Sequence, residues 1–281
     1  MTGLYSHGKE EIVMRILKDA NLMIVGMVVL FVAGVLTASS YALDPKTCVG
    51  MWLFDEGSGT TAKDSSGNGN DGELMGGPKW VAGKFGKALE FDGVDDCVDC
   101  GKGTSLKAVA ELTIQAWINT TDKTTGGQGG SEYCVVHRID VNAPYRGYSF
   151  GRDGTGNYVF FYTGELYAGP HKLIGKTYVI SDGAWHHIAA TYDGTTSKIY
   201  VDGKLDIEAA KTSAFASDVS CQIGRDPWRW YRGLIDDVAV FNVALTEVDV
   251  KNLMKNGVKR GLAPVSPNGR LTTVWGEIKA K

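Results

Sequence analysis

Hydrophobic residues recur at every second position in many short segments of the chain, which is the pattern of β-strands with one buried face. Between Thr113 and Ile118, for example, Ile114, Ala116 and Ile118 occupy alternate positions. Twelve segments rich in β-branched and aromatic residues are predicted to be strands: 49–54, 72–75, 88–99, 112–120, 132–139, 148–152, 158–163, 176–180, 186–192, 197–201, 220–224 and 234–241. Six Asp-Gly dipeptides punctuate the chain, and this pair supplies the positive φ of tight hairpins. The pattern predicts an all-β antiparallel sandwich of about twelve strands.

One helix is predicted after the last strand. Thr246 is a suitable N-cap, with Asp249 three residues later, and Val250 and Leu253 supply an apolar face. Gly257 is expected to end this helix.

An apolar run without charges precedes the strands, at residues 22–36. Arg15 and Lys18 come before it and the triplet Ser40-Tyr41-Ala42 follows, an order typical of a secretory signal peptide cleaved after Ala42. The run is shorter than the ~20 residues that span a bilayer. The alternative is an uncleaved membrane anchor.

Three parts are therefore expected: a signal peptide or N-terminal anchor (1–42), a β-sandwich domain (43–257) and a proline-containing C-terminal tail (258–281). The protein is expected to be secreted or to lie at the cell surface or in the periplasm. Contact with a membrane is expected only through the N-terminal segment, if it stays uncleaved.

Charge and cysteine content narrow the classes of partner and site. The chain has 29 basic and 32 acidic residues, and this near-balance argues against a nucleic-acid partner. Its five cysteines are an odd number, so at least one thiol has no partner within the chain, and the connectivity stays open. Cys97 and Cys100 are three apart in a strand pattern, which places them on opposite faces and argues against a redox or zinc pair.

Several sequence blocks resemble the bacterial LamG-like jelly-roll domain of the concanavalin A-like lectin/glucanase superfamily. They are MWLFDEGSG at 51–59, DSSGNGNDG at 64–72, GKALEFDG at 86–93, WHHIAATYDG at 185–194, IYVDG at 199–203 and GLIDDV at 233–238. The resemblance covers about residues 48–256 and implies a jelly-roll β-sandwich. This fold hosts sugar binding, protein adhesion and catalysis in different members, so it leaves the function open.

The segment 64–72 carries oxygen-bearing side chains at alternate positions, an arrangement that can surround a hard cation such as Ca²⁺. The resemblance implies a structural or ligand-bridging Ca²⁺, and Asp92 or Asp236 is available to complete its site. The predicted metal ligands are Asp64, Asn68, Asn70 and Asp236. The alternative is an Asx-rich turn that holds no ion.

A second candidate site is the segment 225–232, in which three aromatic and three arginine side chains surround a proline. Exposed aromatic faces stack on sugar rings, and Arg and Asp form hydrogen bonds with hydroxyl groups. The predicted ligand-binding residues are Arg225, Asp226, Trp228, Arg229, Trp230, Tyr231 and Arg232. Alternatively, one tryptophan plugs the end of the sandwich and the other aromatic residues cover its rim. Tyr145, Arg146 and His171 lie in other segments that are candidates to border this loop.

The catalytic motif of the superfamily's glucanases, Glu-x-Asp-x-x-Glu, is missing from the sequence, and Asp206 and Glu208 form the nearest pair. The chain is therefore predicted not to be an enzyme. The leading hypothesis is an exported carbohydrate-binding or adhesive module, with a glycan or an extracellular protein as its partner, and with dependence on Ca²⁺ if the ion is bound. The alternatives are a structural or protein-interaction domain of the cell envelope and a divergent glycosidase.

Overall fold

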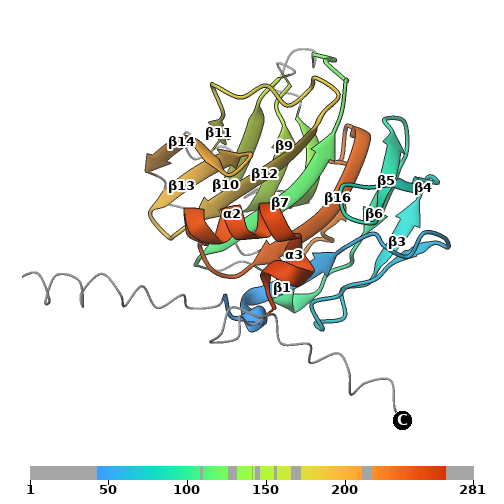
Figure 1. Ribbon diagram of the computed structural model, residues 1–281, viewed down its shortest axis with the longest axis horizontal. Helices are drawn as coiled ribbons and strands as arrows, with labels where there is room; N and C mark the ends of the chain where they lie inside the picture. The colour runs from blue at the N-terminus through green and yellow to red at the C-terminus, as the bar shows by residue number, and fades with distance from the viewer. Residues whose placement is uncertain are drawn as a thin grey trace, which may run out of the picture. The chain divides into compact units, whose positions relative to one another are not determined.

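The computed structural model describes residues 43–107, 110–125, 132–140, 142, 146–154, 157–165, 172–210 and 217–263 (Figure 1). The predicted signal peptide or anchor (1–42), residues 264–281 of the tail, Tyr145 and His171 lie outside these ranges. In the described part no helix is long and apolar enough to cross a membrane.

Strands dominate the described residues. They are β1 (Cys48–Trp52), β2 (Thr61–Ala62), β3 (Gly72–Met75), β4 (Lys79–Ala82), β5 (Lys87–Asp92), β6 (Cys97–Asp99), β7 (Leu112–Asn119), β8 (Tyr133–Ile139), β9 (Arg146–Arg152), β10 (Val159–Glu165), β11 (Lys172–Ile174), β12 (Trp185–Tyr192), β13 (Thr196–Val201), β14 (Lys204–Ala210), β15 (Gln222–Ile223) and β16 (Arg232–Phe241). Two 3₁₀ turns, η1 (Pro45–Thr47) and η2 (Thr104–Leu106), and two helices, α2 (Glu247–Asn256) and α3 (Val258–Gly261), complete the described elements.

The strands form two antiparallel sheets, which confirms the predicted sandwich. One sheet, here called sheet A, has the order β14-β13-β12-β7-β16-β5-β4, with β1 paired to β16. The other, sheet B, has the order β11-β10-β9-β8-β15-β6-β3-β2. Several neighbours in the sheets are far apart in sequence, as β7 and β16 are, so connections cross between layers as in a jelly roll.

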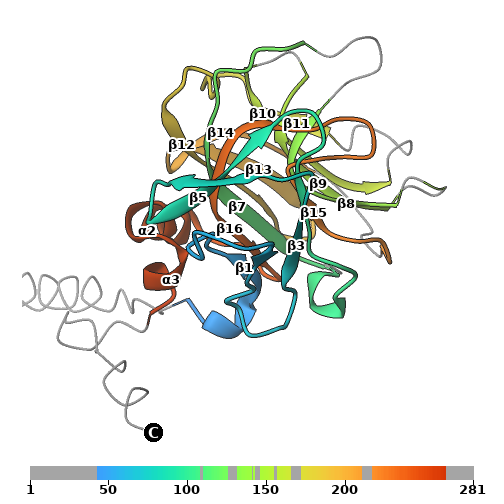
Figure 2. The ribbon, with the colours of Figure 1, turned by 90° about the vertical axis from the view of Figure 1, so that its right-hand side faces the viewer.

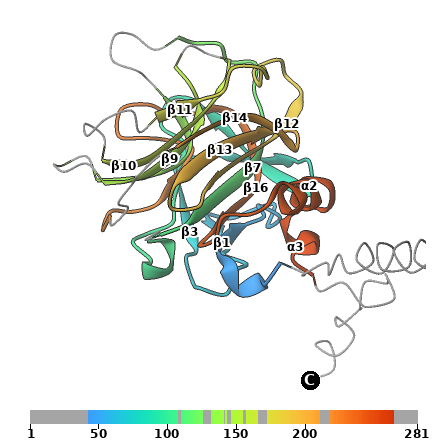
Figure 3. The same ribbon diagram turned by 90° about the vertical axis from the view of Figure 1, so that its left-hand side faces the viewer.

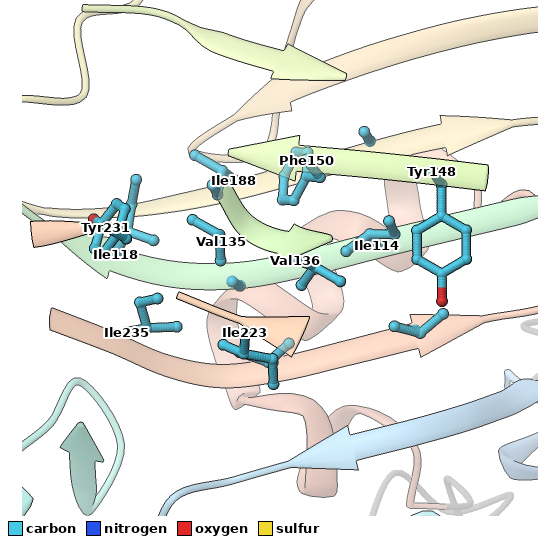
Figure 4. Packing of buried hydrophobic residues seen from close by; sticks show 14 of the residues in the cluster. Ile114, Ile118, Val135, Val136, Tyr148, Phe150, Ile188, Ile223, Tyr231 and Ile235 are labelled. Atoms are coloured by element: carbon cyan, nitrogen blue, oxygen red, sulfur yellow. The ribbon is translucent and has the colours of Figure 1, made fainter. Parts of the chain in front are cut away.

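The main core lies between the two sheets. Figure 4 shows Ile114, Ile118, Ile188 and Ile235 of sheet A packing with Val135, Val136, Phe150 and Ile223 of sheet B. All eight side chains are buried, and the alternation along β7 follows the strand period of two. The alternation in the sequence therefore predicted the core-facing residues of β7 correctly.

A layer of helix covers the outer face of sheet A. In Figure 2, α2 and α3 lie on the left of β7 and β16, whereas β8, β9 and β15 of sheet B lie on the right. Val250 and Leu253 of α2 belong to a second buried cluster with Ala189 of β12 and Phe241 of β16. The N-cap prediction is confirmed, because the Thr246 hydroxyl accepts a hydrogen bond from the backbone of α2 in a capping box.

The predicted end of the domain at Gly257 is wrong. Gly257 ends α2 with a φ of 74°, but α3 begins immediately after it, so the described residues end with two short helices. Val258 and Leu262 belong to the same buried cluster as α2. The packed domain therefore continues beyond residue 258, where the tail was expected to begin.

The strand count also differs from the prediction. The segment 88–99 divides into β5 and β6, and β2, β4, β11 and β14 were not predicted. The segment 176–180 is not a strand, although the side chain of Ile180 is fully buried in the main core. Figure 3 shows β13 and β14 side by side near one edge of sheet A.

Candidate ligand-binding site

The segment 225–232 forms a tight loop between β15 and β16. Arg225 and Trp230 face each other in an isolated antiparallel bridge, and the backbone N–H of Tyr231 donates to the carbonyl of Gly224 at 2.7 Å. The Asp226 N–H donates to the carbonyl of Arg229 at 2.9 Å. The loop is therefore a hydrogen-bonded turn that connects β15 of sheet B to β16 of sheet A.

The carboxylate of Asp226 holds this turn together. It accepts hydrogen bonds from the backbone N–H groups of Trp228 and Arg229, both at 2.8 Å. The residue is only 5% exposed, and its burial raises the pKa of the carboxyl group. The structure therefore gives Asp226 a role in the fold of the loop, and its predicted role in orienting a sugar stays a prediction.

Tyr231 is also a core residue. Its side chain is fully buried and meets the ring of Phe91 edge to face, with ring centroids 6.4 Å apart (its position in the core is seen in Figure 4). The alternative named a tryptophan as the buried aromatic residue of the loop, whereas the fully buried one is Tyr231. The side chain of Tyr231 therefore faces the core, and the ligand-binding prediction is carried by the other side chains of the segment 225–232.

Trp228 is the exposed aromatic residue of the loop. It is 67% exposed, the highest value among the large hydrophobic side chains described except Val248. Trp230 is half-buried, with the Arg225 guanidinium 5.3 Å from its ring centroid. The Arg229 guanidinium lies 5.6 Å from the ring centroid of Tyr133 and donates to the Tyr133 hydroxyl at 3.4 Å. The arginines therefore stiffen the loop by packing on aromatic rings.

A hollow of about 310 Å³ opens beside Trp228. A larger one, about 860 Å³, adjoins it, and the two have Asp92, Asp122, Thr124 and Arg232 in common. Together they form one hollow that runs from the loop along β5 and β16. The side chains of the smaller part are Asp92, Val94, Asp122, Thr124, Tyr133, Trp228, Arg229, Trp230 and Arg232.

One wall of the hollow is held by a buried ion pair that the sequence did not reveal. Arg152 of β9 is 1% exposed, and its guanidinium donates to the Asp122 carboxylate at 3.0 Å and to the Thr124 carbonyl at 3.2 Å. The same guanidinium lies 4.0 Å from the ring centroid of Tyr133. Burial opposes ionisation of Asp122, but hydrogen bonds from Thr124 and the charge of Arg152 lower the pKa of its carboxyl group overall. Asp122 thus presents a fixed negative charge to the hollow.

A cluster of three carboxylates includes two residues that line the hollow, Asp92 and Asp96. Asp92, Asp95 and Asp96 are the only three metal-ligating side chains in the described ranges that lie within 4.8 Å of one another. Asp96 is buried and accepts from the backbone N–H of Asp92 at 2.9 Å, while Asp92 accepts from that of Val94 at 2.8 Å. Burial raises the pKa of the Asp96 carboxyl group. The hydrogen bonds of Asp92 and Asp96 shape the turn between β5 and β6.

Three of the predicted calcium ligands, Asp64, Asn68 and Asn70, lie in one hydrogen-bonded loop. Both oxygens of Asp64 already accept two N–H bonds each, from Met51 and Ser66 and from the backbone and side chain of Asn70, at 2.9–3.0 Å. Asn68 donates through its side-chain amide to Cys48 and Ser66. These hydrogen bonds give the loop the form of an Asx-rich turn.

Asp236 contacts a different part of the molecule. It lies on β16, accepts from the backbone N–H of Phe85 at 2.9 Å, and is fully buried, which raises the pKa of its carboxyl group to about 7. The Ca²⁺ site therefore stays a prediction, with Asp64 and Asn70 bonded to each other within the loop and Asp236 bonded to Phe85.

The adjacent histidines His186 and His187 of β12 have separate hydrogen-bond partners. His186 bonds through its two ring nitrogens with Asp202 at 2.9 Å and with Asp182 at 3.0 Å. His187 is fully buried and contacts the Gln115 side chain at 2.7 Å.

The nearest pair to a glucanase motif has structural partners as well. On β14, Asp206 accepts from the backbone N–H groups of Lys176 and Thr177, at 3.2 and 3.0 Å. Glu208 pairs with Lys198 at 3.3 Å. Both carboxylates therefore take part in contacts between neighbouring segments.

Comparison with solved structures supports the fold. The binding domain of Paraclostridial Mosquitocidal Protein 1 superposes with a TM-score of 0.61 at 16% identity, over 75% of this chain and 52% of that one. Domain 4 of AbnA, an extracellular arabinanase of Geobacillus stearothermophilus, in complex with arabinotriose, gives 0.57 at 19% identity, over 74% and 98%. The binding domain of botulinum neurotoxin DC in complex with rat synaptotagmin II gives 0.58 at 16% identity, over 76% and 52%.

The chain spans about half the length of the toxin binding domains and nearly all of the arabinanase domain. No curated protein matches the chain. The family model described as the concanavalin A-like lectin/glucanases superfamily, of laminin G type, matches residues 92–251, which is more than half of the 281 residues. With two antiparallel sheets in jelly-roll order and a match of that extent, this chain belongs to the concanavalin A-like lectin/glucanases superfamily.

Proposed function

We propose that this chain is an exported, non-catalytic binding module that holds a glycan in the hollow beside Trp228. The observation that carries the proposal is the 67% exposure of Trp228 at the edge of a hollow that also contains charged and hydroxyl groups. An indole face left in water on a rigid loop is typical of a surface that stacks against the C–H face of a sugar.

The polar side chains around Trp228 suit sugar hydroxyl groups. Arg229 and Arg232 supply N–H donors, while Asp92 and Asp122 supply carboxylate acceptors on the same hollow. The hydrogen bonds of Asp226 and the ion pair of Arg152 fix the backbone from which these groups project. Little rearrangement is needed on binding, so the entropic penalty of ordering the loop is small.

The named structural neighbours support two classes of partner. The arabinanase domain is in complex with arabinotriose, which supports a glycan, and the botulinum domain with synaptotagmin II, which supports a protein. A protein partner is therefore the second candidate. The hollow favours the glycan, because its mixed acidic and basic lining around one exposed indole offers many hydrogen bonds and little continuous apolar area.

The affinity expected from this surface is modest. One face of an indole offers roughly 80 Å² of the ~150–250 Å² that an aromatic side chain buries. At about 25 cal/mol per Å², the stack contributes about 2 kcal/mol, or roughly thirtyfold in affinity. Useful adhesion then depends on several copies binding together on one surface.

A glycan array and calorimetry on the full chain test the proposal. We expect Trp228→Ala to weaken binding of the array's best ligand roughly thirtyfold with an unchanged melting temperature, and Trp228→Phe to restore part of it. Val248→Ala is the matched control, since Val248 is exposed on α2, away from the hollow's lining. Equal binding by the wild type and Trp228→Ala, or no glycan bound at all, would overturn the glycan proposal. Release of product from a polysaccharide would overturn the non-catalytic part.

A further inference from the structure

Two of the five cysteines face each other across neighbouring strands. Strands β6 and β15 pair in antiparallel register, with Gln222 opposite Asp99 and Ile223 opposite Val98. The same register puts Cys221 opposite Cys100. The Cys100 N–H donates to the Cys221 carbonyl at 2.8 Å, and the Cys221 N–H donates to the Gly101 carbonyl at 2.9 Å. The backbone therefore holds the two cysteines side by side.

Both side chains also lie on the same side of the sheet. Cys100 and Cys221 are 2% and 0% exposed and belong to the same core cluster. The hydroxyl of Tyr148 lies 4.0 Å from the Cys221 sulfur. Burial raises the pKa of both thiols, that of Cys221 to about 11, and a charge on Cys221 further raises the pKa of Cys100. Opposed residues of an antiparallel pair have Cα atoms roughly 4.5–5.5 Å apart, within the range that a disulfide bridges.

The other cysteines have different surroundings. Cys48 belongs to the cluster beneath α2, and Cys134 to a third cluster on sheet B. Cys97 lies outside the core cluster that holds Cys100, and its thiol is near Arg225. The odd number of cysteines is then accounted for by one pair and three thiols that stay single within the chain.

We propose that Cys100 and Cys221 form a disulfide that joins β6 to β15. The two thiols lose two protons and two electrons as the S–S bond forms, and a small-molecule or protein disulfide, such as glutathione disulfide, accepts them and becomes two thiols. Because the native thiols are buried and weakly acidic, the bond forms while the chain folds, before the core closes over the sulfurs.

This bond supports the candidate site. Strand β6 follows the turn that contains Asp92 and Asp96, and β15 leads directly into the loop of Trp228. The two strands share only two registered pairs, so few backbone bonds hold them together. A disulfide at this point fixes the two chain segments from which one side of the hollow is built.

Counting free thiols on the full chain tests the proposal. The protein is folded in the presence of glutathione disulfide, unfolded at acidic pH with N-ethylmaleimide, and weighed by mass spectrometry. We expect three of the five cysteines to be alkylated, and digestion to release a linked pair of peptides that contain Cys100 and Cys221. Five alkylated thiols, glutathione adducts at these positions, or a link to another cysteine would overturn the proposal.

Thermal melting gives an independent readout. About 120 residues separate the two cysteines, so the bond closes a long loop and restricts the unfolded chain. Reduction is expected to lower the melting temperature of the oxidised wild type by roughly 5–15 °C. The same reductant should leave Cys100→Ala and Cys221→Ala unchanged, while Cys134→Ala, the control, should respond like the wild type. Equal melting of oxidised and reduced wild type contradicts a bond that holds the two strands.

Discussion

The buried pair of Asp122 and Arg152 offers a quantitative test of how the wall of the hollow is held. Replacing Asp122 by alanine leaves the guanidinium of Arg152, which is 1% exposed, without its carboxylate at 3.0 Å. Removing one partner of a buried ion pair costs about 3–5 kcal/mol, because the other charge stays out of water. The carbonyl of Thr124 and the ring of Tyr133 still contact Arg152, so we expect a loss near the lower end, about 3 kcal/mol.

Urea unfolding followed by tryptophan fluorescence measures this loss, since the chain contains seven tryptophans. The melting temperature should fall by roughly 6–12 °C, at 2–4 °C per kcal/mol for a domain of this size. Asp218→Ala is the control. The side chain of Asp218 pairs with Lys107 but is largely exposed, so this substitution should not change the free energy of unfolding measurably.

A double-mutant cycle separates the ion pair from general damage. Asp122→Ala combined with Arg152→Met should destabilise less than the sum of the single changes, because no buried charge is then left unpaired. A loss below about 1 kcal/mol for Asp122→Ala, or strictly additive effects, would refute the reasoning that this pair holds the wall.

Three further outcomes are expected. Hydrogen bonds to Asp202 and Asp182 raise the pKa of His186, so its contribution to stability is full below the unfolded value of 6.5 and disappears as the pH rises through the folded pKa; His186→Gln should therefore flatten the fall in melting temperature as the pH rises above 6.5. Melts with Ca²⁺ and with chelator should coincide, because the Asp64 oxygens are already occupied, and a rise of several degrees would restore the calcium prediction. Gly224→Ala should cost about 3 kcal/mol, since φ is 87° and the new Cβ would lie 2.4 Å from Phe91, whereas Gly59→Ala, with a similar φ in open space, should cost less in the same denaturation assay.

The core of the fold was predictable because strands with one buried face leave a period of two in the sequence. Strand β7 shows this, with Ile114, Ala116 and Ile118 all in the core. Strand β14 escaped prediction because it lies at a sheet edge, where few of its side chains are buried and little alternation is required. Conversely, the segment 176–180 was predicted to be a strand because Ile180 is apolar. Ile180 is buried in the core, but the segment does not pair with a strand.

The site was predictable in part. The composition of the segment 225–232 pointed to the loop, and Trp228 is exposed there. The composition of the loop does not indicate which of its aromatic side chains points into the core. Tyr231 points inward, because it immediately precedes β16 and packs against Phe91. Asp122 and Arg152 were missed because they come together only through the pairing of distant segments, which leaves no local signal.

Strand β14 forms one edge of sheet A, and its contacts affect how copies of this domain behave when many lie close together on a surface. The carboxylate of Asp206 accepts hydrogen bonds from the backbone N–H groups of Lys176 and Thr177, which follow the edge strand β11 of sheet B. Lys204 and Glu208 add exposed charges along the same strand. An edge that is tied to its neighbour and charged is a poor template for strand addition by another copy. Many copies displayed close together can therefore stay separately folded instead of assembling edge to edge into aggregates.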